Sequence, residues 1–267
     1  MKVRFPKWDF STMRAHWAPS LEFSHKYNAA STVPAHIEPY LIKVMMQAKK
    51  VLDPKHAKLH AELEIFIKQE VQHCKQHVAF NNALYALGYE GMRAVEAPYK
   101  ADYDDFLKNK SLRFNLAYSE GFEAMGSSSA EVFFECLNEY LEGADADSVA
   151  MWKWHLAEEF EHREVAFSVY HAIYGRGPFS YLYRLYGLIY AVKHIRSHTR
   201  RVEDFLLNQD RSKMTPEDAA ASVERQKVVS KAVGKASLPK ILGVLSPFYD
   251  PGKKAPTSGM LAFLEQV

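Results

Sequence analysis

The sequence predicts an all-α protein in which long helices pack side by side. Several long segments repeat their apolar residues every three or four positions, which is the spacing of one helix face. No segment shows the apolar–polar alternation of a strand, and no repeat of solenoid length occurs. Two of the segments carry a Glu-x-x-His pair within the apolar face. The helices are therefore expected to bury polar side chains together.

The composition excludes several classes of protein. The chain has 267 residues, of which 48% are hydrophobic and 25% charged, and its formal net charge of +2 gives no electrostatic support for nucleic-acid binding. Neither Cys74 nor Cys136 belongs to a CxxC pair, so no disulfide framework or thiolate zinc site is expected. No signal-peptide core and no apolar run of about eighteen residues occurs. We therefore expect a cytoplasmic protein.

The first helix is predicted to begin at Pro34. Residues 1–30 show no sustained period and are expected to form an arm on the domain surface. Ser31 or Thr32 would cap the helix, since proline is tolerated in a first turn. Glu38 is the one acidic residue on this helix and is a candidate metal ligand. Compensation of the helix dipole is its alternative explanation.

A second helix is predicted over residues 55–87, ending near Gly88. Its inner face carries Glu70 and His73, a Glu-x-x-His pair that offers a carboxylate and an imidazole to one cation. His77 follows one turn later on the same face. We expect it to hydrogen-bond behind the ligands, with direct ligation as the alternative.

A third helix is predicted over residues 111–141, after a long connection at 88–110. Glu120 and Glu123 both fall on its inner face. Glu120 is the predicted ligand, and Glu123 is either a hydrogen-bonding neighbour of the ligands or the ligand itself. The small residues of 126–130 either permit close helix packing or leave a cavity beside the metals.

The fourth helix, residues 152–171, contains no proline or glycine and carries the richest set of donors. His155, Glu159 and His162 line one stripe, because residues three and four apart share a helix face. Glu158 is a candidate to support the ligands from behind. Burying a carboxylate in such a stripe is costly unless it is paired or binds a cation. A solvated face is the alternative for this helix taken alone.

The rest of the chain is expected to cover the bundle. Residues 179–206 predict a fifth helix that packs on the bundle or lies on an anionic membrane surface. It would also roof a channel to the metals, and its basic end would suit an acidic substrate. Residues 208–267 predict a short polar helix near 215–234 and a wrapping tail that belongs to the same unit as 1–207. The basic residues of the fifth helix are Lys193, Arg196, Arg200 and Arg201.

Taken together, the candidate ligands resemble a known arrangement. One Glu from each of two helices and a Glu-x-x-His from each of two others form the dinuclear site of ferritin-like bundles. Residues 34–171 resemble the ferritin-like diiron oxidases and oxygenases, which implies a ferritin-like four-helix bundle with additional C-terminal helices. The residues that carry the resemblance are Glu38, Glu70, His73, Glu120, Glu159 and His162.

Two narrower resemblances add to this. His155, one turn before Glu159, is similar to the extra histidine of diiron arylamine N-oxygenases, which implies that it is a seventh ligand. Gly121 stands where we expect a histidine from the family pattern. Nearly the whole chain also resembles a bacterial family labelled "predicted metal-dependent hydrolase". The segments that carry this resemblance include YNAASTVPAHIE, FIKQEVQHCKQH, LAYSEGFEAMGS and WKWHLAEEFEH.

The resemblances imply an enzyme with two metal ions, iron first, with manganese or zinc as alternatives. The leading function is a diiron oxygenase that activates O₂ and oxidises a small, hydrophobic and acidic organic substrate, with an electron donor as partner. A metal-dependent hydrolase that uses a metal-bound hydroxide is the alternative, and an iron-storage bundle is a third. A homodimer and a peripheral membrane contact stay open, and no nucleic-acid partner is expected.

Overall fold

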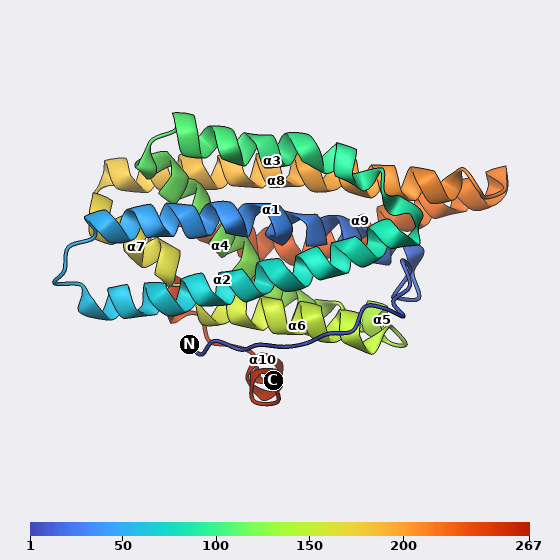
Figure 1. The fold of residues 1–267 in the computed structure, drawn as a ribbon, viewed down its shortest axis with the longest axis horizontal. Helices are drawn as coiled ribbons and strands as arrows, with labels where there is room; N and C mark the ends of the chain where they lie inside the picture. The colour runs from blue at the N-terminus through green and yellow to red at the C-terminus, as the bar shows by residue number, and fades with distance from the viewer.

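The computed structural model describes all 267 residues, and none of them lies in a strand (Figure 1). The prediction of an all-α bundle is confirmed. None of the helices is long and apolar enough to cross a membrane. The helices are α1 (Leu21–Val51), α2 (Ala57–Leu84), α3 (Met92–Asn109), α4 (Leu112–Cys136), α5 (Asn138–Leu141), α6 (Ala146–Glu161), α7 (Val165–Tyr174), α8 (Pro178–Arg211), α9 (Pro216–Val244) and α10 (Ser258–Leu264).

The long helices run along the same axis of the molecule. In Figure 1, α3 and α8 lie along the top, α1 crosses the middle, and α2 and α6 lie below. Helix α4 is the central element, because it packs against α1, α6, α7, α8 and α9. The chain before α1 runs along the outside of α6, and α10 packs below α6. The helices α1, α2, α4 and α6 thus surround one interior.

Helix α1 begins at Leu21, earlier than predicted. Ser20 caps it, and the Ser20 Oγ accepts a hydrogen bond of 3.1 Å from the backbone N–H of Phe23. Ser31 and Thr32, the predicted caps, are buried inside the helix. The predicted start at a proline was therefore wrong, since an earlier and stronger cap extends the helix through residues assigned to the arm.

The predicted connection at 88–110 was wrong over most of its length. It contains α3, which follows a π-helical turn at Tyr85–Tyr89. The buried residues of α3 are spaced alternately by four and three, the period of a helix face. The sequence contains this spacing, but the mixed charges of the segment favoured the prediction of a connection. The buried residues are Met92, Glu96, Tyr99, Tyr103 and Phe106.

The predicted fourth helix is two helices, with a break after Glu161. The break contains neither proline nor glycine. Arg163 stabilises it, since its Nη1 donates a 2.6 Å hydrogen bond to the carbonyl of Phe160 at the end of α6. The same guanidinium donates from Nε to the Pro251 carbonyl at 2.8 Å. A partner from the distant C-terminal segment therefore helps to end α6.

Helices α4 and α8 approach very closely. A Cβ on Gly187 would clash with the backbone of Ala117, and a Cβ on Gly121 would lie 2.8 Å from the Cα of Leu188. Two glycines therefore let the two backbones touch, and this contact places α8 against the bundle. Helix α8 extends beyond the predicted fifth helix, and α9 is longer than the short helix predicted near 215–234.

The apolar core is divided into two large clusters. On α2, Phe66 belongs to one cluster and Phe80 to the other, and the Glu-x-x-His pair lies between them in sequence. On α6, Phe160 belongs to the same cluster as Phe80. Val229 of α9 and Met260 of α10 also join that cluster. The polar interior therefore lies at the junction of two apolar cores.

Candidate metal centre

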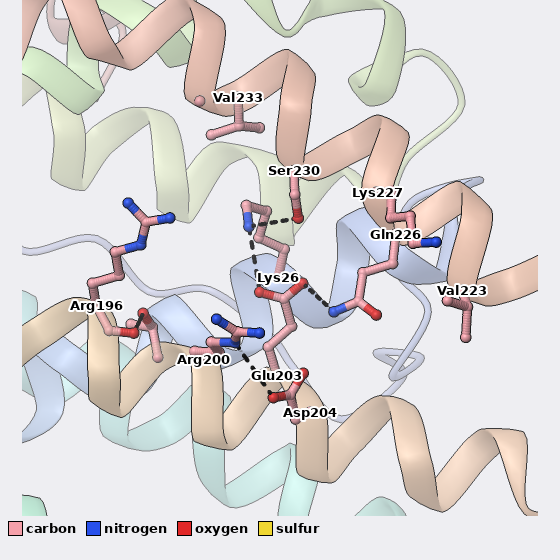
Figure 2. A pocket seen from close by; sticks show the side chains of 12 residues that line it. Lys26, Arg196, Arg200, Glu203, Asp204, Val223, Gln226, Lys227, Ser230 and Val233 are labelled. Carbon is pink, nitrogen blue, oxygen red and sulfur yellow. Dashed lines mark hydrogen bonds and ion pairs between the residues drawn. The ribbon is translucent and has the colours of Figure 1, made fainter.

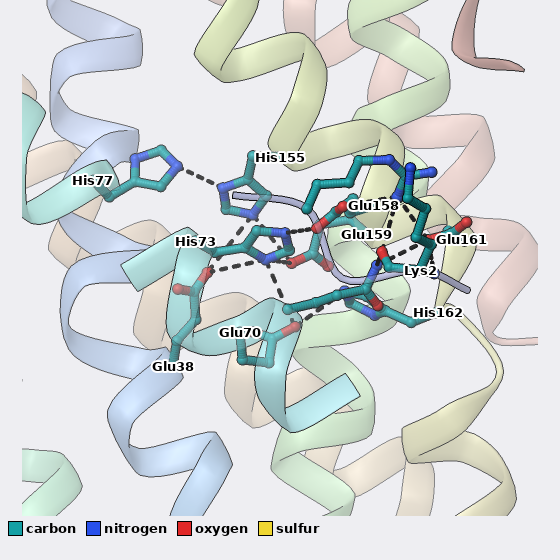
Figure 3. Close-up of polar contacts among 12 residues, drawn as sticks. Lys2, Glu38, Glu70, His73, His77, His155, Glu158, Glu159, Glu161 and His162 are labelled. Carbon is teal, nitrogen blue, oxygen red and sulfur yellow. Dashed lines mark hydrogen bonds and ion pairs between the residues drawn. The ribbon is translucent and has the colours of Figure 1, made fainter. Parts of the chain in front are cut away.

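Four helices bring seven acidic and imidazole side chains into one buried cluster, and Figure 3 labels all of them except Glu123. Each of these residues is at most 3% exposed. Helix α1 contributes one residue, α2 two, α4 one and α6 two, and the seventh caps the end of α6. We call this set the metal cluster: Glu38, Glu70, His73, Glu123, His155, Glu159 and His162.

Two overlapping groups within the metal cluster have the geometry of a cation site. In each group, donor atoms from all four residues lie within 4.8 Å of one another. His73 and Glu159 belong to both groups, so the two sites are adjacent and share ligands. The first group is Glu38, His73, His155 and Glu159, and the second is Glu70, His73, Glu159 and His162.

The first group is built around the carboxylate of Glu159. His155 Nε2 lies 3.1 Å from Glu159 Oε1 and 3.7 Å from Glu38 Oε1. His73 Nδ1 lies 3.8 Å from Glu159 Oε1 and 3.9 Å from Glu38 Oε1. The imidazoles of His73 and His155 stack, with ring centroids 4.4 Å apart. Two imidazole nitrogens and two carboxylates thus converge from three helices.

The second group is built around His162. Its Nε2 lies 3.0 Å from Glu70 Oε1, and its Nδ1 lies 3.0 Å from Glu123 Oε2. His73 Nδ1 lies 3.7 Å from Glu70 Oε1, which connects this group to the first. Glu123 therefore stands at the outer side of the second group, with its Oε1 free of any hydrogen bond.

Many donor atoms of the metal cluster have no hydrogen-bond partner within the protein. These orphans are both oxygens of Glu38, Oε2 of Glu70, one oxygen each of Glu123 and Glu159, and Nδ1 of His73. Oε1 of Glu70 and Nε2 of His162 lie 3.0 Å apart but are not aligned for a hydrogen bond. Buried polar atoms without a partner are rare because each is costly. Carboxylate oxygens and imidazole nitrogens are ligands for divalent iron, manganese or zinc. The residues present therefore fit metal binding.

The electrostatics of the cluster point the same way. Burial, followed by repulsion from Glu70, raises the pKa of Glu38 well above its ordinary value. Burial, followed by repulsion from Glu159, does the same to the pKa of Glu123. Burial lowers the pKa of His73 well below its ordinary value. A metal-free cluster therefore disfavours ionised carboxyl groups, and two divalent cations would balance the four negative charges of the ionised forms.

The structure does not bring Glu120 into the metal cluster. Its Oε1 lies 3.1 Å from Nη1 of Arg184 on α8, and both side chains are buried. Glu123, the alternative on the same helix face, lies beside His162 instead. The sequence did not distinguish the two because the deciding partner, Arg184, comes from a helix far along the chain.

Two residues on the outer side of the cluster orient its histidines. The Nε2 of His77 hydrogen-bonds to Nδ1 of His155, and its Nδ1 lies 2.8 Å from the Ser31 hydroxyl. The Nε2 of His73 lies 3.1 Å from Oε2 of Glu158. Such contacts fix the tautomer and direction of an imidazole that binds a metal. They leave Nε2 of His155 and Nδ1 of His73 directed into the cluster.

Arg4 contacts the carboxylates next to the cluster, a position that the sequence did not indicate. It lies in the N-terminal segment, where its Nη1 donates to Oε1 of Glu158 at 2.8 Å and to Oε2 of Glu161 at 3.1 Å. It therefore anchors the carboxylate that holds His73. No local pattern indicates a role for Arg4, because its partners on α6 are distant from it in the sequence.

The run of small residues at 126–130 serves two purposes. A Cβ on Gly126 would clash with Oε2 of Glu159, so glycine lets that carboxylate lie against α4 in its present position. Gly126 and Ser129 also line a cavity that reaches His155. Ser127 and Ser128 turn elsewhere, with both hydroxyls donating to the carbonyl of Ala124. Close packing and a cavity thus occur together.

The fold and the cluster define an all-α bundle with a buried carboxylate–histidine cluster that could hold metal ions. The chain belongs to the family described as "Predicted metal-dependent hydrolase", whose model matches residues 2–255. No curated protein and no solved structure matches the chain. The family and the cluster both indicate a metal-dependent protein, and they leave the identity of the metal open.

Proposed function

We propose that this chain is a metal-dependent enzyme that binds two divalent cations in the metal cluster. The observation that carries the proposal is the convergence of donor atoms, many of them orphaned, in two groups that share His73 and Glu159, with Glu123 of α4 beside the second group. When bound, such cations supply Lewis-acid activation of a substrate or of water at neutral pH. In this proposal Glu123 takes the place that the sequence analysis gave to Glu120.

We propose hydrolysis of an organic substrate as the leading reaction, which the description of the family supports. The protein's own contribution is to hold the ligands and the substrate. Glu158 and Arg4 keep His73 in place, and His77 keeps His155 in place. The two apolar cores keep bulk water from the charged groups, which strengthens every electrostatic interaction there.

Oxidation of the substrate with O₂ is the second candidate. It is favoured by the donor set, four carboxylates and three imidazoles, which suits iron in two oxidation states. The cavity that reaches His155 and Glu159 is lined mainly by apolar side chains, which suits an apolar substrate group. This reaction would need an electron donor as a partner.

The test begins with metal content. The metal-free protein is loaded without O₂ with Fe(II), Mn(II) or Zn(II), and bound metal per chain is measured. We expect two cations per chain in the native protein and almost none in His73→Ala. A native protein that binds no metal, or a variant that keeps full occupancy, contradicts the proposal.

The same loaded samples separate the two reactions. A metal-dependent hydrolase turns over a panel of aryl and alkyl esters in the Mn(II) or Zn(II) form without O₂. An O₂-dependent enzyme consumes O₂ only in the Fe(II) form, with a change in the optical spectrum of the iron. His155→Ala is informative in both assays, because it removes a donor of the first group and leaves the second intact.

A further inference from the structure

An inner cavity of about 210 Å³ connects the metal cluster to the side of the bundle. Residues from α1, α4, α6, α8 and α9 form its wall, and nine of the sixteen are hydrophobic. His155 and Glu159 close its inner end, and Phe122 and Met125 of α4 lie along it. This is a small apolar space with the metal ligands at its base.

An outer cavity of about 510 Å³ lies between α8, α9 and the start of α1 (Figure 2). It shares Lys26, Thr199 and Val233 with the inner cavity, so the two spaces meet at these side chains. Only two of its twelve lining residues are hydrophobic. From the outer cavity to the inner one, the lining therefore changes from polar to mainly apolar.

The outer cavity carries an excess of positive charge. Its wall contains four basic and two acidic side chains. Lys26 is engaged, with its Nζ 3.3 Å from Glu203, whereas Arg200 lies only loosely beside Asp204, at 3.8 Å. Arg196 takes part in no ion pair, and Figure 2 shows it together with Arg200 between α8 and α9. Two guanidinium groups are thus available to a ligand.

We propose that the substrate is an amphipathic organic anion that binds across both cavities. Its apolar end fills the inner cavity against His155 and Glu159 and is an aryl ring or a medium-length alkyl chain, attached through an ester or amide bond where the reaction is hydrolysis. Its anionic head, a carboxylate or a phosphate, binds Arg196 and Arg200 in the outer cavity. This inference rests on the proposed function for the site of reaction, because it places the reacting atoms at the end of the molecule farthest from the head.

The physical reasons for the two ends are different. Transfer of apolar surface from water into the inner cavity stabilises the complex in proportion to the area buried. Guanidinium groups match the planar, bidentate geometry of carboxylate and phosphate. The inner cavity is smaller than the roughly 300–1,000 Å³ typical of sites that hold a whole ligand. It therefore accommodates only the apolar end, and the head is left in the outer cavity.

Calorimetric titration of the full chain tests this without any measurement of activity. Octanoate and octyl phosphate are compared with 1-octanol, in both metal-loaded and metal-free protein. We expect both anions to bind more tightly than the alcohol. The double variant Arg196→Gln/Arg200→Gln should weaken the binding of the anions at least about tenfold and leave that of 1-octanol unchanged.

Two further variants keep the test sharp. Arg201→Gln, next to Arg200 in sequence and outside the cavity wall, should behave like the native protein. Ser129→Phe fills the inner cavity from an exposed position and should abolish binding of all three ligands while metal content stays native. Equal affinity for octanoate and 1-octanol, or equal effects of the double variant and Arg201→Gln, overturns the inference.

The outcome is separable from that of the proposed function. Anion binding that depends on Arg196 and Arg200 in a chain that takes up no metal upholds the ligand site and refutes the metal enzyme. Native metal content, together with anions that bind independently of the two arginines, refutes the proposed ligand site and leaves the metal enzyme standing. In that case, binding that occurs only in the loaded protein would place the anionic head on the metals.

Discussion

Two clusters of histidine and acid occur in this molecule, and they differ in how their polar atoms are satisfied. The metal cluster lies in the interior, and a second cluster joins His16 and His25 to Asp210 near the end of α8. Both bring at least three donor atoms within 4.8 Å of one another. By proximity alone, both would be metal sites.

In the Asp210 cluster, hydrogen bonds within the protein satisfy both carboxylate oxygens of Asp210. The Nε2 atoms of His16 and His25 each lie 2.6 Å from Oδ2 of Asp210, and the hydroxyl of Tyr89 donates to Oδ1 at 2.7 Å. The metal cluster instead leaves carboxylate oxygens and an imidazole nitrogen without partners. We infer from this difference that proximity of possible metal ligands does not by itself indicate a cation site. Buried ligand atoms that lack a hydrogen-bond partner do indicate one. The Asp210 cluster ties the N-terminal segment to α8.

The largest expected effect separates the two clusters directly. His73→Ala removes the imidazole that both cation groups share, so bound metal should fall from two ions per chain to nearly none. His25→Ala, the matched change in the Asp210 cluster, should keep full occupancy. Metal analysis after loading and desalting measures both. Loss of metal in His25→Ala would break the distinction between the clusters.

A second pair of variants compares Glu123 with Glu120 on one helix. Glu123→Ala should lower metal content, because it removes a carboxylate beside His162. Glu120→Ala should keep the metal but lower the free energy of unfolding by about 3–5 kcal/mol, because it leaves the buried guanidinium of Arg184 unpaired. Urea denaturation and metal analysis of both variants provide the measurement. An exchange of these phenotypes would return Glu120 to the ligand set.

A third variant tests the stabilising role of Asp210. Asp210→Asn should lower the free energy of unfolding by about 1–3 kcal/mol at pH 6, since buried donors lose a charged acceptor. Burial alone would raise the pKa of Asp210, but the hydrogen bonds from His16, His25 and Tyr89 outweigh it and lower that pKa.

The pH dependence of this third effect follows from the sign of the shift. A carboxylate with a lowered pKa in the folded protein stabilises it above the ordinary Asp value of about 3.9, and this stabilisation is lost as the pH falls further. The difference between native protein and variant should therefore shrink below about pH 4. Denaturation curves from pH 6 to pH 3.5 measure it, and a difference that grows toward acid contradicts the assignment.

The sequence was sufficient for the fold class and for most of the polar interior. Helix faces repeat at a fixed spacing, and the two Glu-x-x-His pairs stand out because they interrupt apolar stripes. The structure brings together Glu38, Glu70, His73, His155, Glu159 and His162. Local spacing had singled out all of these except Glu38, which was noted as the one acidic residue of its helix. Spacing works here because each helix places its inward residues by its own periodicity.

The rest depends on partners that are distant in the chain. Glu120 and Glu123 share a helix face, and only Arg184 on α8 separates their roles. Arg4 supports the cluster from a segment without periodicity. The break after α6 is stabilised by a C-terminal carbonyl. Helix α3 is a different case. Its buried residues already have helical spacing in the sequence, but the mixed charges of the segment led to the prediction of a connection.

The smallest expected effect concerns His198, which sharpens the rule drawn from the two clusters. His198 is fully buried, its Nε2 lies 2.8 Å from the hydroxyl of Thr32, and its ring stacks on Tyr99 with centroids 3.7 Å apart. Its Nδ1 is orphaned, yet His198 belongs to no group of converging donors. A single orphan should therefore bind no metal, and His198→Phe should keep full occupancy.

The same variant should change the pH dependence of stability. Burial lowers the pKa of His198 to about 3. The folded protein then binds no proton there between the ordinary value of about 6.5 and pH 3, whereas the unfolded chain does. This costs the native protein about 1.4 kcal/mol at pH 5.5, with almost no cost at pH 7.5. Between these two pH values the native protein should lose that much more stability than His198→Phe in urea denaturation, since the other histidines contribute equally to both. Parallel pH profiles would show that His198 takes up a proton in the folded state. Loss of metal in the variant would show that a single orphaned nitrogen contributes to metal binding.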